Sequence, residues 1–193
     1  MANLQDFITS KVRVKLLTLF LSQTEDMFYV RQLTRLADEE INAVRRELLH
    51  LQKIGFLTSE RRGNRLYYKL NQRYQFLPEL VAMVAKTQGL GQTIIKHRQK
   101  LGKLKFAVLS GRFARHLPRK PDTVDLLLVG NVVLPQLAVL IKSQEETVGR
   151  EINYTVMTEE EFRYRKSRRD PFIYSILMES RIMLIGDEEE LLA

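Results

Sequence analysis

The chain has 193 residues, 45% of them hydrophobic, and this length suits two domains of about 100 residues each. It contains no cysteine, which excludes disulfides, thiol nucleophiles and cysteine-ligated metal centres, and its formal net charge is +8. Its apolar runs fall short of the roughly 20 residues that cross a bilayer, and the N-terminus has no signal-peptide pattern, so we expect a cytoplasmic protein without a membrane partner.

The positive charge is concentrated in the N-terminal half. Residues 1–100 carry 17 basic and 9 acidic side chains, whereas residues 101–193 carry 14 of each. Localised basic charge favours a polyanionic partner, because Lys and Arg neutralise phosphates and release counterions. We therefore expect the N-terminal half to contact nucleic acid.

The first elements follow from apolar spacing. A helix is predicted over residues 4–22, a strand at residues 28–30 that pairs with a later hairpin, and a second helix over about 31–37. Asp38 is well placed to cap a third helix over about 39–54, and Gly55 to end it. The residues expected to be buried in the second and third helices are Leu33, Leu36, Ala37, Ile41, Val44, Leu48, Leu51 and Ile54.

The third helix and the segment after it carry the candidate DNA contacts. Arg can bind guanine bidentately and Asn can bind adenine. A DNA-recognition helix inserts its N-terminal part into the major groove, where these base edges are accessible. Residues 56–60 and 66–70 flank a Gly-Asn turn, which predicts a hairpin whose basic tip contacts phosphate or the minor groove. The expected contact residues are Asn42, Ala43, Arg45, Arg46, His50, Arg61, Arg62, Asn64 and Arg65.

A family resemblance follows from these segments. The N-terminal part resembles the winged helix-turn-helix domains of ArsR-like and MarR-like transcription regulators. The resemblance is carried by residues 30–37, 44–48 and 51–57, and most specifically by Gly55-Phe56-Leu57, which leads into an Arg-rich hairpin. The resemblance covers about residues 5–75 and implies binding of double-stranded DNA by a homodimer. It does not imply metal sensing, because the Cys ligands of metal-responsive relatives are missing. Winged helices also serve as protein-interaction modules, which leaves a protein partner as an alternative.

The middle of the chain predicts two more helices. Apolar residues recur at helical intervals over residues 77–101, with a break at Gln88-Gly89-Leu90-Gly91. We interpret residues 77–102 as a helical linker and dimerisation segment, because two apolar helix faces can pack together. The expected domains are therefore 1–76, 77–102 and 103–193.

The C-terminal part resembles the minimal nucleotidyltransferase fold. Strands are predicted at 105–109, 124–129, 152–157 and 181–186, with a helix over 134–146 and further helices after the capping residue Thr158. The segment Leu109-Ser110-Gly111-Arg112-Phe113-Ala114-Arg115 stands where the family has a Gly-Ser turn that holds phosphates. The resemblance implies three carboxylates that bind two Mg²⁺ ions.

Most of that catalytic set is absent from this chain. Gly111 and Asp125 match the family, whereas Arg112 replaces the Ser, Thr123 replaces the first carboxylate, and Asn153 falls at the third. One aligned carboxylate cannot assemble a two-metal site, so we expect no enzyme activity and no cofactor. The segment remains a candidate for a vestigial nucleotide pocket formed by Gly111, Arg112, Arg115, Thr123, Asp125 and Asn153.

Alternatives remain open for the C-terminal half. An active Mg²⁺-dependent nucleotidyltransferase could use Asp122, Asp125 and Glu151 in an altered geometry, although Asp122 is one residue out of register. A phosphate-bearing small ligand could bind the basic loop of Arg112, Arg115, His116, Arg119 and Lys120, which is otherwise a solvated loop. The basic run at 163–169 predicts a helix surface that could add DNA or dimer contacts, and the acidic run at 187–190 predicts a solvated terminus.

The expected fold class is therefore α+β with two domains. An N-terminal winged helix-turn-helix is followed by a helical linker and a C-terminal nucleotidyltransferase-like α/β domain. The expected function is sequence-specific DNA binding in transcription regulation, with the C-terminal domain serving dimerisation or the binding of a ligand or protein partner.

Overall fold

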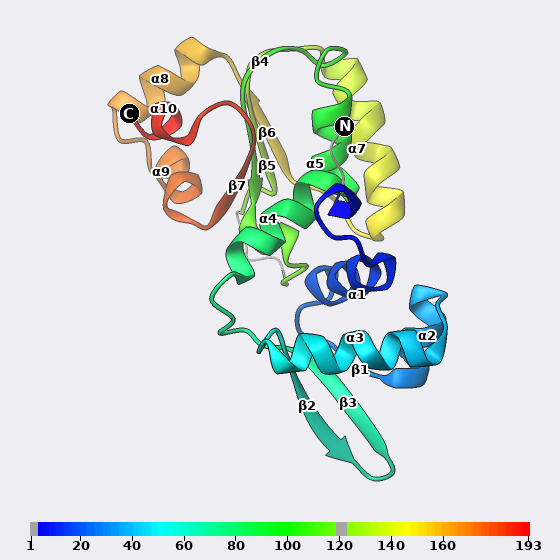
Figure 1. Cartoon of the computed structure of the whole chain (residues 1–193). Coiled ribbons are helices and arrows are strands. Elements are labelled where there is room, and N and C mark those ends of the chain that lie inside the picture. The colour runs from blue at the N-terminus through cyan, green and yellow to red at the C-terminus, as the bar shows by residue number, and fades with distance from the viewer. Residues whose placement is uncertain (1–3, 119–122) are drawn as a thin grey trace. The chain divides into compact units, whose positions relative to one another are not determined.

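The computed structural model describes residues 4–118 and 123–193 and confirms an α+β protein (Figure 1). Its contacts divide the chain into two compact units. The first unit comprises the residues up to 84 together with 115–117, and the second comprises 85–114 and 118–193. The boundary falls inside helix α4 (Leu77–Thr87), so the segment 77–102 does not form a unit of its own.

The first unit combines helices with a small antiparallel sheet of order β1-β3-β2. The long hairpin of β2 and β3 projects beyond its helices (Figure 1). The edge strand β1 pairs with β3 through the register Phe28↔Tyr68, which confirms the predicted pairing. The elements before α4 are η1 (Leu4–Asp6), α1 (Lys11–Ser22), β1 (Met27–Tyr29), α2 (Val30–Ala37), α3 (Ile41–Lys53), β2 (Leu57–Arg62) and β3 (Arg65–Leu70).

The core of the first unit joins the buried sides of these elements. Phe20 of α1 meets Phe28 of β1 edge to face, with ring centroids 5.4 Å apart. The predicted buried positions Leu33, Ala37, Val44, Leu48 and Leu51 are buried. Three expectations were wrong: Leu36 and Ile54 are 50% and 46% exposed, and Ile41 is only half-buried. All three lie at a helix end: Leu36 in the last turn of α2, Ile41 at the start of α3 and Ile54 at its C-cap.

Two helix starts also differ from the prediction. The expected helix over 4–22 is interrupted, because Ser10 takes an extended backbone and its Oγ accepts a hydrogen bond from the Arg13 amide at 3.2 Å, which starts α1 at Lys11. Asp38 does not cap α3. It adopts a left-handed backbone with φ 49° at the end of α2, and Glu40 becomes the N-cap of α3.

The predicted hairpin is present and its turn is short. Arg62 pairs with Arg65 across the strands, which leaves Gly63 and Asn64 as a two-residue loop. Gly63 has φ 56°, whereas Asn64 does not need the positive φ that its type tolerates. The three arginines of the expected tip therefore lie in the strands themselves, with their directions fixed by the sheet.

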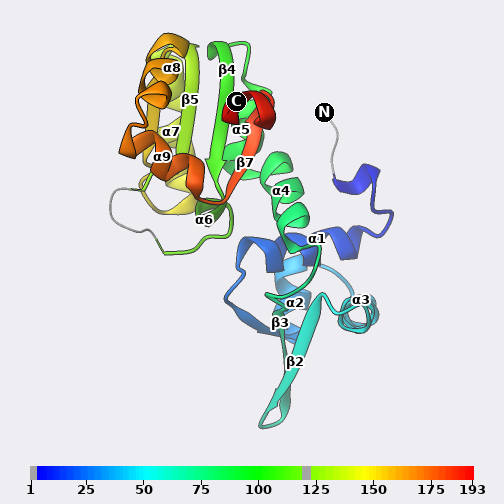
Figure 2. The ribbon, with the colours of Figure 1, turned by 90° about the vertical axis from the view of Figure 1, so that its left-hand side faces the viewer.

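The second unit is a four-stranded sheet of order β6-β5-β4-β7, in which β5 and β6 are parallel and the other pairs antiparallel. Helices α8, α9 and α10 lie along one face and α5 and α7 along the other (Figures 1 and 2). Its elements are α5 (Gly89–Lys96), β4 (Gly102–Ser110), α6 (Gly111–Ala114), β5 (Leu126–Val132), α7 (Leu134–Val148), β6 (Tyr154–Met157), α8 (Glu159–Ser167), α9 (Pro171–Met178), β7 (Arg181–Ile185) and α10 (Glu188–Leu192).

The four predicted strands and the helices expected between the later strands are confirmed, whereas the expected loop after the first strand contains the short helix α6. Thr158 caps α8 by accepting from the Glu161 amide at 3.1 Å. The acidic residues 187–190 are exposed, as predicted. The segment is nevertheless folded into α10, whose Leu191 is fully buried in the core, and Glu190 pairs with Lys105. None of the helices in residues 4–118 and 123–193 has the length and apolarity of a membrane span.

Candidate nucleic-acid interface

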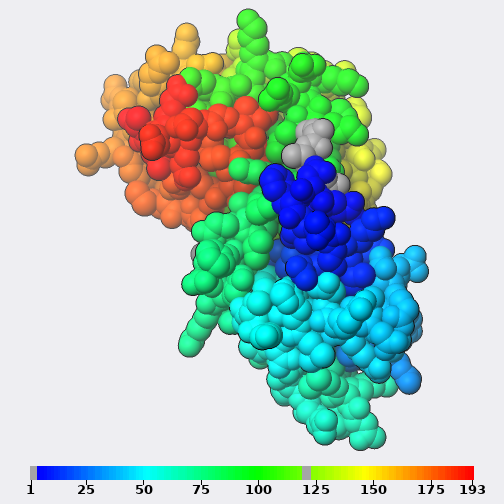
Figure 3. Space-filling model, in the orientation of Figure 1, coloured from blue at the N-terminus to red at the C-terminus, as the bar shows by residue number. Residues whose placement is uncertain are grey.

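One side of α3 is an exposed, mostly polar stripe. Because an α-helix turns about 100° per residue, positions opposite the buried Val44, Leu48 and Leu51 face solvent together. Ala43 lies at the edge of the stripe and is half-buried. The exposed residues on this side are Asn42, Arg45, Arg46, Leu49, His50 and Lys53. Figure 3 shows α3, in cyan, at the surface of the first unit.

Two members of this stripe were not among the expected contact residues. Leu49 is 61% exposed and lies between the basic positions, and Lys53 continues the stripe by one turn from Leu49. The helical spacing from Asn42 through Arg46 and Leu49 to Lys53 was a signal that could have found both. The stripe therefore runs the length of α3 and includes one apolar residue.

The N-terminus of α3 is closed by Glu40. Its Oε2 accepts hydrogen bonds from the backbone amides of Asn42 at 2.7 Å and Ala43 at 2.9 Å. These two hydrogen bonds, followed by the nearby charges of Arg46 and Arg45, hold the pKa of the Glu40 carboxyl below its usual value. Since both amides are already occupied, a DNA phosphate at this end would be bound by side chains.

A charged contact holds α3 against α1. Glu47 accepts hydrogen bonds from the Arg13 Nε at 2.8 Å and from the Ser10 Oγ at 2.7 Å. Burial alone would raise the pKa of Glu47, but these two hydrogen bonds outweigh it and lower that pKa. Lys15 pairs with Glu39 at 2.6 Å. Arg13 and Lys15 thus have structural partners within the first unit.

The hairpin divides its arginines between two faces. Residues paired directly across the strands share a face, and faces alternate along each strand. Arg62 and Arg65 are paired and share one face, whereas Arg61, paired with Leu66, lies on the other. Arg62 binds Glu60 at 3.1 Å, and the Arg65 guanidinium stacks 4.7 Å from the centre of the Tyr29 ring. These contacts relieve the repulsion expected between two like charges opposite each other.

The face that carries Arg61 is the face toward α3. Ser59 lies on the same side of β2 as Arg61, two residues away, and it accepts a hydrogen bond from the Gln52 Nε2 of α3 at 3.0 Å. Arg61 is exposed, and its side chain has no hydrogen bond or ion pair with the described residues. The stripe of α3 is therefore extended by one uncompensated arginine of the hairpin.

In the second unit, Asp125, which was expected to match a catalytic carboxylate, has a structural role. Asp125 is only 5% exposed, and its Oδ2 accepts from the Asn153 amide at 3.0 Å. The Asn153 Nδ2 in turn donates to the Thr123 carbonyl at 2.9 Å. Asp125 and Asn153 thereby join the segment before β5 to the segment before β6, while Glu151 is exposed and Asp122 lies outside the described residues.

Gly111 also has a packing explanation. A Cβ on Gly111 would lie 2.5 Å from the Ser180 Oγ, and the Gly111 amide donates to the Ser180 carbonyl at 2.7 Å. Arg112, which follows it, donates from Nη2 to the Pro118 carbonyl at 2.8 Å. The need for glycine here therefore arises from the close approach of Ser180, without reference to a phosphate.

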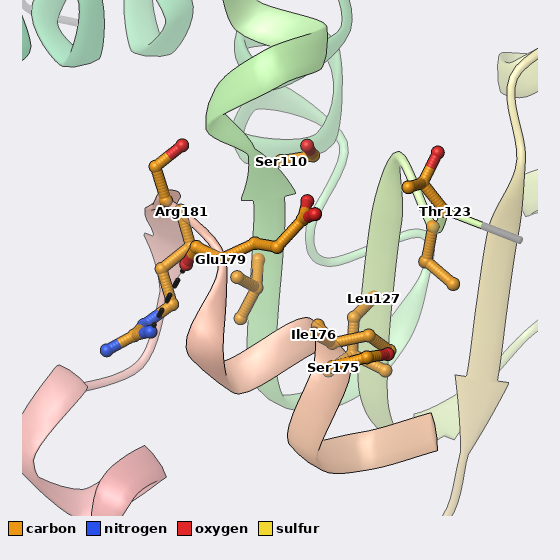
Figure 4. Close-up of a pocket in the computed structure, with 10 residues that line it drawn as sticks. Ser110, Thr123, Leu127, Ser175, Ile176, Glu179 and Arg181 are labelled. Carbon is orange, nitrogen blue, oxygen red and sulfur yellow. Dashed lines mark hydrogen bonds between the residues drawn. The ribbon is translucent and has the colours of Figure 1, made fainter. Parts of the chain in front are cut away.

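A hollow of about 250 Å³ lies between the ends of β4 and β5 and helix α9 (Figure 4). Of the predicted pocket residues, Thr123 lines it, together with Ser110, Ser175 and Glu179. Figure 4 shows the Glu179 carboxylate directed toward Ser110 and the Arg181 guanidinium directed away from the hollow.

The remaining members of the predicted basic loop are dispersed. Arg115 and His116 belong to the first unit, where the Arg115 carbonyl accepts from the Thr24 Oγ1 at 3.0 Å, and Arg119 and Lys120 lie outside the described residues. The loop is therefore not assembled around Gly111 by the described residues. Comparison of the chain with protein-family models, curated proteins and solved structures found no match in any of the three.

Proposed function

We propose that this protein is a sequence-specific, DNA-binding transcription regulator. Its first unit acts as a winged helix-turn-helix, with α2 and α3 as the two helices and the β2–β3 hairpin as the wing. Its second unit has a nucleotidyltransferase-like fold that does not transfer nucleotides. The observation that carries the proposal is the exposed stripe of α3, which presents Arg45, Arg46 and Lys53 on the side opposite its buried residues.

The chemistry of the stripe suits the major groove. An α-helix fits that groove, where Arg recognises guanine and Asn recognises adenine through paired hydrogen bonds. Asn42, Arg45 and Arg46 lie in the first two turns of α3, the part that reaches base edges in helix-turn-helix proteins. The same three residues therefore carry the proposed sequence specificity.

The hairpin supplies the proposed contacts to the phosphate backbone of DNA. Arg61 lies on the α3 side without a compensating carboxylate among the described residues, and the arginines on the other face remain exposed. Contacts to phosphate set the position of a protein on DNA without reading sequence. Arg61 therefore contributes affinity and salt dependence.

A homodimer would complete the function. Two copies of α3 would read half-sites separated by about 34 Å, one turn of the duplex. The proposed cellular location is the cytoplasm.

The test is fluorescence anisotropy with the duplex upstream of the protein's own coding sequence and a scrambled duplex, each at several salt concentrations. We expect selective binding by the wild type and at least a tenfold loss with Arg46→Ala. Lys142→Ala, an exposed residue of α7 in the second unit, removes the same charge and should leave affinity within twofold. Absence of binding to either duplex at low salt would overturn the proposal.

A protein partner is the second candidate, and the exposed apolar residues favour it. Leu36 of α2 and Leu49 of α3 are 50% and 61% exposed, and large exposed apolar side chains can anchor a protein interface. This candidate predicts that Leu49→Ser abolishes capture of the partner while binding is insensitive to salt. DNA binding predicts a steep salt dependence instead.

A further inference from the structure

The second unit contains a larger hollow that the proposed DNA interface does not use. It has a volume of about 600 Å³ and lies against α8, α9 and the end of the described chain. Six charged side chains line it, four of them basic: Lys105, Arg163, Lys166, Arg169, Glu159 and Glu190. A concave surface lined mainly by one sign of charge concentrates ions of the opposite sign.

The basic run at 163–169 is divided by the fold into two sets. Arg165 pairs with Glu161 at 2.8 Å, and Arg168 lies over the Tyr164 ring at 5.3 Å. Neither lines the hollow. Arg163, Lys166 and Arg169 do line it, because residues three apart share a helix side and Arg169 turns back with a left-handed φ of 53° after α8 ends.

The residues that line the hollow hold charge that is only partly compensated. The Arg163 and Arg169 side chains make no hydrogen bond or ion pair with any described residue. Lys166 donates one hydrogen bond, at 2.8 Å, to the Leu191 carbonyl, which is uncharged. Burial lowers the pKa of Lys166, so its ammonium gives up hydration without gaining a carboxylate. Lys105 is the cation that does have an acidic partner, Glu190.

The attraction of cations to the C-terminus of a helix explains part of this arrangement. Lys166 lies in the last turn of α8, where the helix dipole favours positive charge. Arg169 directly follows the C-cap Arg168 and also lies near this end, whereas Arg163 lies before the last turn, where the effect is weak. The dipole therefore favours Lys166 and Arg169 but does not account for Arg163, and it supplies no carboxylate to any of the three.

We propose that this hollow binds a small phosphate monoester, whose phosphate is held by Arg163, Lys166 and Arg169. A phosphate dianion offers three oxygens to several donors, and Arg binds such groups bidentately. The volume suits a small organic ligand, and Tyr174 on the wall can contact the part that bears the phosphate. The site belongs to the second unit and is independent of DNA binding by α3.

Titration calorimetry of the full chain with adenosine monophosphate, adenosine and inorganic phosphate tests this site. We expect the monophosphate to bind, inorganic phosphate to bind more weakly, and adenosine not to bind. The double variant Arg163→Gln, Arg169→Gln should weaken monophosphate binding at least tenfold. The matched double variant Arg165→Gln, Arg168→Gln removes the same charge from the same segment and should change it less than threefold.

Three results would overturn the site. They are absence of binding of both phosphate compounds to the wild type, equal losses in the two double variants, and equal binding of adenosine and its monophosphate. The comparison of adenosine with its monophosphate uses only the wild type, so it remains decisive if a variant fails to fold. A loss of duplex DNA affinity in Arg163→Gln, Arg169→Gln without any monophosphate binding would assign these arginines to DNA instead.

Discussion

Gln52 in α3 and Ser59 in β2 are joined by a hydrogen bond of 3.0 Å from the Gln52 Nε2 to the Ser59 Oγ. This bond connects the helix that carries Asn42, Arg45 and Arg46 to the hairpin that carries Arg61. The base of the hairpin is held in the core by Leu57 and Tyr68, and β3 pairs with β1, while the outer part of the hairpin projects beyond the helices (Figure 1). The bond adds a direct polar link between the two proposed DNA-contacting surfaces.

Gln52→Ala should weaken DNA binding without removing a charge. A neutral hydrogen bond contributes about 1 kcal/mol, so we expect a fall of that order in the free energy of unfolding and a severalfold loss of affinity. Urea unfolding and anisotropy measure the two effects. Ser59→Ala should act alike, and the double variant should be no worse than either single one. Additive losses would show that the bond does not couple helix and hairpin.

Arg45→Ala and Arg46→Ala should each reduce operator affinity. A lost base contact costs about 1–3 kcal/mol and relaxes the preference at one base pair, whereas a lost phosphate contact weakens all sequences alike. Anisotropy against an operator set with single substitutions distinguishes these cases. Equal affinity of both variants and the wild type for every duplex would contradict a groove-binding α3.

Arg61 and Arg62 should differ in their effect on salt dependence. Arg61 lacks a compensating carboxylate among the described residues, so Arg61→Ala should lower the slope of log affinity against log salt by about one unit. Arg62 already pairs with Glu60, which raises the pKa of Arg62, so Arg62→Ala should change the slope less. Glu60→Gln releases Arg62 and should tighten binding to both operator and scrambled duplexes. If the slope in all three variants equals that of the wild type, the hairpin does not contact DNA.

Glu47 should make the stability of the first unit depend on acid pH. Its pKa in the folded chain lies below the ordinary value of a glutamate carboxyl, about 4.5, so between the two values the unfolded state binds more protons. The stabilisation is thus complete above about pH 4.5 and is lost as the pH falls through the folded pKa. Glu47→Gln should lower the free energy of unfolding by about 2 kcal/mol at neutral pH.

Urea unfolding of wild type and Glu47→Gln, at about pH 7 and about pH 3, measures this difference. The gap between the two proteins should narrow in acid. Glu79→Gln, which removes an exposed carboxylate of α4 in the same unit, serves as the control. A gap of unchanged size at both pH values would show that Arg13 and Ser10 do not act through the charge of Glu47.

Asp125 should be required for stability and not for nucleotide transfer. Its carboxylate is buried and accepts from the Asn153 amide, so Asp125→Ala should cost about 1–3 kcal/mol, and Asp125→Asn less because it keeps an acceptor oxygen. Urea unfolding gives these values. Incubation of the wild type with labelled nucleotide and Mg²⁺ or Mn²⁺ should give no transfer. Transfer that disappears in a folded Asp125→Asn would restore the enzyme hypothesis.

The sequence by itself determined the order of elements and the solvent-facing side of α3. Apolar residues at a spacing of three and four fix which side of a helix is buried, wherever that helix packs. Thus Asn42, Arg45 and Arg46 could be selected from spacing alone, and the Gly-Asn turn placed the hairpin. These features depend on local periodicity and on the backbone freedom of glycine.

Only the tertiary structure decided how individual charged residues are used. Asp38 and Glu40 are both acidic and adjacent to α3, and the left-handed backbone at Asp38 leaves the capping role to Glu40. Strand register places Arg61 apart from Arg62 and Arg65, because neighbours along a strand face opposite ways. Register, helix ends and long-range pairing depend on contacts between distant segments, which local patterns do not encode.

The second unit shows the same contrast between what the sequence predicts and what the tertiary structure decides. Its strands were predictable from apolar runs, but the burial of Asp125 and the docking of α10 by Leu191 depend on packing across the sheet. The basic run at 163–169 is uniform in sequence, yet the fold gives some arginines acidic or aromatic partners and directs Arg163 and Arg169 into a hollow. Charge is a property of the residue, whereas compensation of that charge is a property of its neighbours in space.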